Sequence, residues 1–172
     1  TTASIFLNPL RIDNNEEFVD ILVADEGYLL LIQAKDSPNT ERSLSRTMER
    51  KRATVSKALD KAIDQTRGAI KYVRRQEDLH FHFGDEIIEI ETHDKGIRNL
   101  IVVQEAFEYD WESYSSRALK LSDEMDSPCY VMGYAELVTW TAELNTPEEF
   151  FEPFDSIMEE GRQTGVFPRI TF

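Results

Sequence analysis

The sequence predicts an α/β fold in which helices cover both faces of a central sheet. Three features predict it: apolar runs of strand length, one long segment with helical periodicity, and the alternation of these two patterns along the chain. The chain has 172 residues, of which 41% are hydrophobic and 30% are charged, a globular composition. This length suits one domain, residues 1–172, and the start at Thr1 rather than Met is compatible with a longer parent chain.

A β-hairpin is expected over residues 18–36. Its two arms, residues 18–24 and 28–34, are apolar runs rich in Val, Leu and Ile, and the turn between them is Asp25-Glu26-Gly27. A two-residue loop in this turn pairs residues whose numbers add to 53, whereas a three-residue loop with a glycine bulge shifts the pairing somewhat. The second arm is apolar on both faces except at its end, so we expect it to be a central strand.

Polar residues gather at the open end of this hairpin. With the two-residue loop, Asp20 lies opposite Gln33, with Cβ atoms about 5 Å apart, and Lys35 points to the same face as Gln33. Each of these residues alone is compatible with an ordinary strand end, but together they form a polar cluster that needs a partner. A carboxylate and an amide oxygen are suitable ligands for Mg²⁺, and a lysine beside them is suited to stabilise developing negative charge.

A long amphipathic helix is expected in the segment after residues 36–40. Its apolar stripe recurs at helical spacing and consists of Val55, Leu59, Ala62, Ile63, Thr66, Ala69, Ile70 and Val73. Lys57 and Lys61 project away from this stripe, and Gln65 lies at its border. The helix therefore has one buried face and one basic, exposed face.

The charges of the chain are segregated. Residues 42–75 contain eleven Lys or Arg and three Asp or Glu, a local charge of +8, so that a chain of net charge −14 carries −22 in its remainder. A basic segment of this kind suits an anionic partner. The alternative is that the basic helix packs against acidic parts of its own fold.

The rest of the chain supplies further strands and helices. Strands are expected at residues 3–7, 79–83, 86–92, 99–104 and 129–134, a loop at residues 8–15, and a helical stretch at residues 135–144. The last helix has marked boundaries, with Thr146 as N-cap, Pro147 at its first position and Gly161 after its end.

Cysteine and histidine add little evidence for a second site. His80 and His82 share one face of an expected strand, but a third ligand is not evident, so we expect surface or structural histidines. The single Cys129 is expected to be a buried small hydrophobe. One cysteine, no signal-peptide pattern and no apolar run of bilayer length together predict a cytoplasmic protein without a membrane partner.

The hairpin residues resemble a known superfamily. Asp20, a strand, a turn, and Gln33-Ala34-Lys35 at the end of the next strand resemble the PD-(D/E)xK nucleases, which have the restriction-endonuclease-like fold. The similarity covers roughly residues 16–103 and extends to Gln65, because several branches carry a glutamine near the site on the following helix. It implies a mixed central β-sheet flanked by helices.

The resemblance also implies roles for these residues. Asp20, Gln33 and Lys35 are then catalytic, and Asp20, Gln33 and the carbonyl of Ala34 are ligands of Mg²⁺ or Mn²⁺. Gln33 stands where Glu or Asp is usual, which removes one negative charge from the metal site, although functional QxK variants are known in the superfamily.

A further acidic residue of the superfamily is missing from its usual place. The helix that commonly precedes the strands, often with this acidic residue, is not evident before residue 16. Glu16 or Glu17 is therefore the candidate for the additional carboxylate.

Three functional hypotheses follow. The first is a Mg²⁺-dependent nuclease, with DNA as the expected substrate and with Lys57, Lys61 and Gln65 contacting the nucleic acid. The second is a binding or scaffold module that keeps the nuclease-like fold without catalysis, with Gln33 as the mark of the loss. The third is that the acidic remainder binds another protein or a second copy of the chain as a homo-oligomer. The sequence leaves open DNA against RNA and exonuclease against endonuclease.

Overall fold

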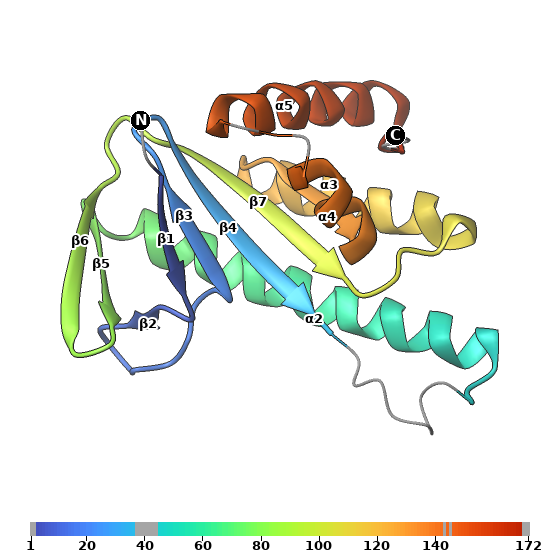
Figure 1. The fold of residues 1–172 in the computed structure, drawn as a ribbon, viewed down its shortest axis with the longest axis horizontal. Helices are drawn as coiled ribbons and strands as arrows, with labels where there is room; N and C mark the ends of the chain where they lie inside the picture. Colours follow the sequence, from blue (N-terminus) through green and yellow to red (C-terminus); the bar gives the residue numbers. More distant parts are fainter. Residues whose placement is uncertain (1–2, 37–44, 143, 145, 170–172) are drawn as a thin grey trace.

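The strands of the protein form two sheets (Figure 1). The computed structural model describes residues 3–36, 45–142, 144 and 146–169. In the larger sheet the strand order is β1 (Ser4–Leu7), β3 (Ile21–Ala24), β4 (Tyr28–Lys35), β7 (Gly96–Val103) and β8 (Cys129–Gly133). In the smaller sheet the order is β2 (Leu10–Arg11), β5 (Asp78–Phe83) and β6 (Glu86–Glu91).

The larger sheet is mixed, with β4 at its centre. β4 pairs with β3 in the antiparallel sense and with β7 in the parallel sense, and β7 pairs with β8 in parallel. Both faces of β4 are buried over residues 29–33, which confirms the prediction of a central, covered strand. The predicted α/β class with a mixed sheet flanked by helices is therefore confirmed.

The register of the hairpin follows from its short turn. Ile21 pairs with Ile32 and Ala24 with Leu29, so the numbers of opposed residues add to 53 as the two-residue loop predicts. The N–H of Asp25 donates to the carbonyl of Tyr28 at 2.9 Å and closes the turn. Extending this pairing by one residue brings position 20 opposite position 33.

Helices cover both faces of the larger sheet (Figure 1). They are α2 (Met48–Arg74), α3 (Trp111–Met125), α4 (Tyr134–Ala142) and α5 (Pro147–Thr164), and a short 3₁₀ turn, η1 (Glu108–Asp110), precedes α3. α2 covers the face of Leu31, which clusters with Ile70, whereas α5 covers the other face, where Phe151 stacks on Tyr28 with centroids 4.4 Å apart. No helix within the described ranges is long and apolar enough to cross a membrane.

α2 forms because its N-terminus is capped and its apolar stripe is buried. The side chain of Thr47 accepts the N–H of Arg50 at 3.4 Å, and all eight residues of the predicted stripe are buried. Residues 37–40, which precede the predicted helix segment, and the start of the basic segment at residue 42 lie outside the described residues. α3, for which the sequence pattern gave no prediction, lies beside α2, where Arg117 pairs with Asp60 at 2.7 Å.

The smaller sheet packs against the edge of the larger one. The ring of Phe6 in β1 contacts Phe81 in β5 edge to face, with centroids 5.0 Å apart. The strands predicted at residues 79–83 and 86–92 are present, and together they form a sheet of their own with β2. The loop predicted at residues 8–15 is therefore wrong in part, because Leu10 and Arg11 pair with β5. A two-residue strand is too short to show an alternating pattern.

The predicted end of the last helix at Gly161 is wrong. α5 begins as predicted, with Thr146 as its cap, but it continues to Thr164 and ends at Gly165, which has the left-handed φ of 81°. Gly161 lies inside the helix, where a Cβ would overlap the ring of Phe167. This glycine therefore marks close packing and not a helix end.

Gly161→Ala is expected to destabilise the protein by about 1–3 kcal/mol, because the added methyl group overlaps the buried Phe167 ring. Gly68→Ala is the matched control, since Gly68 also lies inside a helix and a Cβ there meets nothing within 4 Å. Alanine favours a helix over glycine, so the control is expected to stabilise by about 0.5–1 kcal/mol. Urea unfolding measures both changes, and equal stabilisation by both substitutions would contradict the packing role of Gly161.

Candidate active site

The polar residues of the hairpin lie together at its open end. Asp20 directly precedes β3, and Lys35 is the last residue of β4. The Lys35 ammonium lies 3.5 Å from Asp20 Oδ2 and donates to Gln33 Oε1 at 3.4 Å. Asp20 Oδ2 also accepts the backbone N–H of Ala34 at 2.5 Å. The structure thus brings together the four hairpin residues that the sequence selected.

Gln33 is held in one orientation. Its side chain is 2% exposed, and its amide nitrogen donates to the carbonyl of Phe18 at 3.3 Å. Because the nitrogen has this partner, the amide oxygen faces Lys35. A neutral amide therefore occupies this buried position, where a carboxylate would need a positive partner.

Glu17, and not Glu16, is the carboxylate that lies beside Asp20. Burial and then the hydrogen-bonding Asp20 carboxyl raise the pKa of Glu17, whereas Lys35 opposes the increase. Glu16 turns away, because its carboxylate accepts the side-chain N–H of Asn14 at 2.9 Å. Two adjacent carboxyl groups therefore share one lysine.

A small cavity of about 160 Å³ adjoins this cluster between β4 and α2. We name it the Gln33 cavity, and it is lined by Arg11, Glu17, Phe18, Gln33, Gln65, Gly68 and Ala69. Gln65 lies on the exposed border of α2, as predicted, and reaches the same cavity as Gln33. The two glutamines and Glu17 give the cavity polar walls.

Lys57 and Lys61 lie outside the cluster. Both are exposed, and they share one face of α2 with Gln65 because the three residues are spaced by four. Within the described part of the chain neither lysine makes an ion pair. The basic face of α2 therefore leads along the helix to the Gln33 cavity.

Most arginines of the basic segment have internal partners. Arg52 pairs with Asp110 at 2.5 Å, and Arg67 pairs with Glu124 at 3.0 Å. Arg74 donates to the backbone carbonyls of residues 125 and 126, and Arg75 pairs with Asp13. These contacts fit the alternative that the segment packs against its own fold, whereas Lys57 and Lys61 are exposed and form no such pair in the described part of the chain.

The oxygen atoms of the cluster fit a hard divalent cation. Glu17 and Asp20 supply carboxylates and Gln33 supplies an amide oxygen. Burial, followed by the neighbouring Asp20 carboxyl, raises the pKa of Glu17, and a bound cation would offset both effects. The structure, over the residues that it describes, has no group of three His, Cys, Asp or Glu side chains placed to hold a metal. His80 instead contacts Glu89 at 2.9 Å.

Sequence patterns missed the residues that hold the loop before Asp20. The hydroxyl of Tyr72 accepts the N–H of Ile12 at 3.0 Å and donates to the carbonyl of His80 at 2.7 Å. The guanidinium groups of Arg11 and Arg75 each lie 5.0 Å from the Tyr72 ring. In the sequence, Tyr72 is only an aromatic residue beside the apolar stripe, and no local signal pairs it with residues 60 positions away.

The mixed sheet flanked by helices has a restriction-endonuclease-like fold, as its similarity to a solved structure shows. The structure is similar to the small subunit of the heterodimeric restriction endonuclease R.BspD6I, with a TM-score of 0.50 and 16% sequence identity. The match covers 90% of this chain and 69% of that subunit. No protein-family model matches the chain, and no curated protein matches it either.

Proposed function

We propose that the protein is a Mg²⁺-dependent nuclease that hydrolyses phosphodiester bonds of DNA. The observation that carries the proposal is the position of the Lys35 ammonium, within 3.5 Å of Asp20 and 3.4 Å of Gln33 at the end of the hairpin. The structural neighbour supports it, because that protein is a subunit of a restriction endonuclease. A nuclease-like fold alone hosts several functions, so the site and not the fold is the argument.

Hydrolysis requires a water molecule as nucleophile and stabilisation of negative charge at phosphorus. Asp20, Glu17 and Gln33 would hold Mg²⁺, with the carbonyl of Ala34 as a further ligand. When bound, Mg²⁺ polarises the phosphoryl oxygen and lowers the pKa of a bound water. A new bond forms between the water oxygen and phosphorus, and the bond from phosphorus to the leaving sugar oxygen breaks.

Lys35 contributes a positive charge next to the reacting phosphate. Its side chain is 16% exposed, so the ammonium acts in a largely dehydrated site where electrostatic interactions are strong. In this position it donates to a phosphoryl oxygen as that oxygen gains charge, or it orients the attacking water. The carboxylate of Asp20, 3.5 Å from the Lys35 ammonium, holds the ammonium in this position.

The exposed lysines of α2 supply backbone contacts. Lys57 and Lys61 lie on the helix face that leads to the Gln33 cavity and form no ion pair in the described part of the chain. Contacts from these lysines to phosphates give affinity without sequence preference. Their positive charge also counters the repulsion expected between DNA phosphates and a chain of net charge −14.

Lys57→Ala and Lys61→Ala are each expected to weaken DNA binding and to reduce the slope of log K against log salt concentration by about 1. Each lysine that contacts a phosphate releases about one condensed counterion, which is the source of the slope. Fluorescence anisotropy across a salt titration measures this. Lys120→Ala on α3, whose side chain is 77% exposed, is the control and should leave the slope unchanged. An unaltered slope in both α2 variants would show that this helix is not part of the DNA-binding interface.

The test of the proposed function is cleavage of labelled single- and double-stranded DNA and RNA with Mg²⁺, Mn²⁺ or EDTA. Metal-dependent cutting supports the proposal and identifies the substrate. The competing function is a non-catalytic nuclease-like module, favoured by the neutral Gln33 at a metal-ligand position. A folded protein that neither cuts nor binds metal in calorimetry would establish that module instead.

A further inference from the structure

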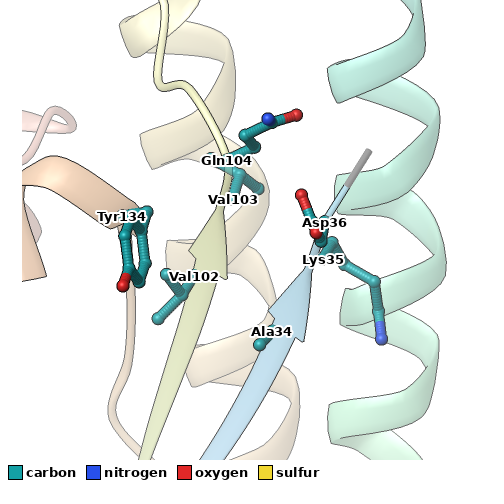
Figure 2. Close-up of a pocket in the computed structure, with 7 residues that line it drawn as sticks. All are labelled: Ala34, Lys35, Asp36, Val102, Val103, Gln104 and Tyr134. Carbon is teal, nitrogen blue, oxygen red and sulfur yellow. The ribbon is translucent and has the colours of Figure 1, made fainter. Parts of the chain in front are cut away.

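A second cavity lies where β4 and β7 end, and it extends to Tyr134 on the side of the sheet away from α2 (Figure 2). It has a volume of about 430 Å³, within the range of about 300–1,000 Å³ typical of ligand sites. We name it the Tyr134 pocket. It is lined by residues 34–36 of β4 and its continuation, residues 102–104 of β7 and its continuation, and Tyr134 of α4 (Figure 2).

The Tyr134 pocket and the Asp20–Lys35 cluster meet at Lys35, which borders the pocket while its ammonium points away from Tyr134 (Figure 2). Successive residues of a strand point to opposite faces, so Ala34 and Lys35 face different sides of β4. Figure 2 shows the Lys35 ammonium directed towards α2, whereas Ala34 and Val102 are directed towards Tyr134. A chain of nucleotides that crosses the end of β4 would therefore meet the lysine on one side and the pocket on the other.

The walls of the pocket match the surface of a nucleobase. Ala34 and Val102 form an apolar floor, and Tyr134, which is 61% exposed, lies beside it. Asp36 and Gln104 add polar groups at the rim. A nucleobase has flat apolar faces that stack on an aromatic ring and a polar edge that forms hydrogen bonds.

The backbone of Tyr134 is fixed although its ring is exposed. The carboxylate of Glu136 accepts the N–H of Gly133 at 2.6 Å and pairs with Arg169 at 3.0 Å. This contact anchors the start of α4 at the end of β8. The exposed ring is thus held on a rigid element, which lowers the entropy lost when a ligand stacks on it.

We propose that the Tyr134 pocket binds an unpaired nucleobase of the strand whose phosphate lies at Lys35. The inference rests on the proposed nuclease function and specifies its substrate as single-stranded or locally unpaired nucleic acid. A paired base faces its partner inside the duplex and cannot enter a pocket on the far side of the sheet unless it leaves the stack.

The experiment uses the full chain, EDTA, low salt and a single-stranded oligonucleotide that contains the fluorescent base 2-aminopurine. Binding is expected to quench its fluorescence through stacking. Tyr134→Ala is expected to weaken binding about 5- to 150-fold, because one stacked base contributes about 1–3 kcal/mol. Tyr134→Phe should keep the affinity, and Tyr109→Ala, at an 85% exposed tyrosine outside the pocket, should leave it unchanged.

Three results overturn the inference: equal affinity of Tyr134→Ala and the unaltered protein, equal loss in Tyr109→Ala, or the same loss on a duplex as on a single strand. Thermal melting confirms that the variants are folded. Because the assay contains no metal, it is separate from cleavage. Tyr134-dependent binding without cleavage in Mg²⁺ would refute only the proposed nuclease activity, whereas cleavage without Tyr134-dependent binding would refute only the base pocket.

Discussion

Lys35→Ala should lower the rate of metal-dependent phosphodiester cleavage about 10²- to 10³-fold, as expected when one preorganised donor to the transition state is removed. The reason is the location of the ammonium, 16% exposed and 3.5 Å from Asp20, where the proposed mechanism places the phosphate that gains negative charge. Single-turnover cleavage at saturating protein and metal measures the chemical step directly. Substrate binding should change much less than the rate.

Asp20→Asn is the companion variant and separates metal binding from charge stabilisation. It removes a carboxylate from the proposed metal site while it keeps a side chain of similar size, so the metal dependence should move to higher Mg²⁺ concentration. Lys35→Ala should leave that concentration nearly unaltered. Unchanged single-turnover rates in both folded variants would place the reaction elsewhere in the protein.

Tyr72→Ala should destabilise the protein by about 3–5 kcal/mol, the range expected for loss of a buried aromatic side chain. The ring is 3% exposed and packs on Phe18, with centroids 4.9 Å apart. Its hydroxyl also joins the loop of Ile12 to the carbonyl of His80. Denaturant unfolding monitored by circular dichroism gives the change in free energy.

Tyr72→Phe isolates the hydroxyl from the ring. It should cost about 1–3 kcal/mol, because the N–H of Ile12 and the carbonyl of His80 lose their partner while the packing is kept. If the phenylalanine variant is as stable as the unaltered protein, the two hydrogen bonds do not contribute, and the ring alone holds the loop.

The sequence contains the information for the hairpin and for the buried stripe of α2 because both depend on short-range periodicity. A two-residue turn fixes the pairing, so opposite positions at 20 and 33 follow by counting, and a helical stripe needs only the spacing of its apolar residues. The burial of Cys129 also follows from its apolar surroundings, and that burial raises the pKa of its thiol to about 12.

Features that depend on contacts between residues far apart in the sequence could not be predicted in the same way. Glu16 and Glu17 are neighbours in the chain, and only the tertiary path of the loop turns one towards Asp20 and the other towards Asn14. Gly161 looks like a helix end until Phe167 is placed against it. Asp110, the partner of Arg52, and Glu124, a partner of Arg67, lie more than 50 residues away from these arginines, beyond any local pattern.

The smaller sheet determines how far this domain can be trimmed. Glu17 forms a backbone bridge with Leu10, and Leu10 in turn pairs with His82 of β5. The β5–β6 hairpin lies away from the Asp20–Lys35 cluster, yet its pairing with β2 holds the stretch that presents Glu17. A minimal fragment that keeps the larger sheet and α2 but omits residues 78–91 would retain Lys35. It would lose the strand pairing that holds Glu17, the second carboxylate beside Lys35.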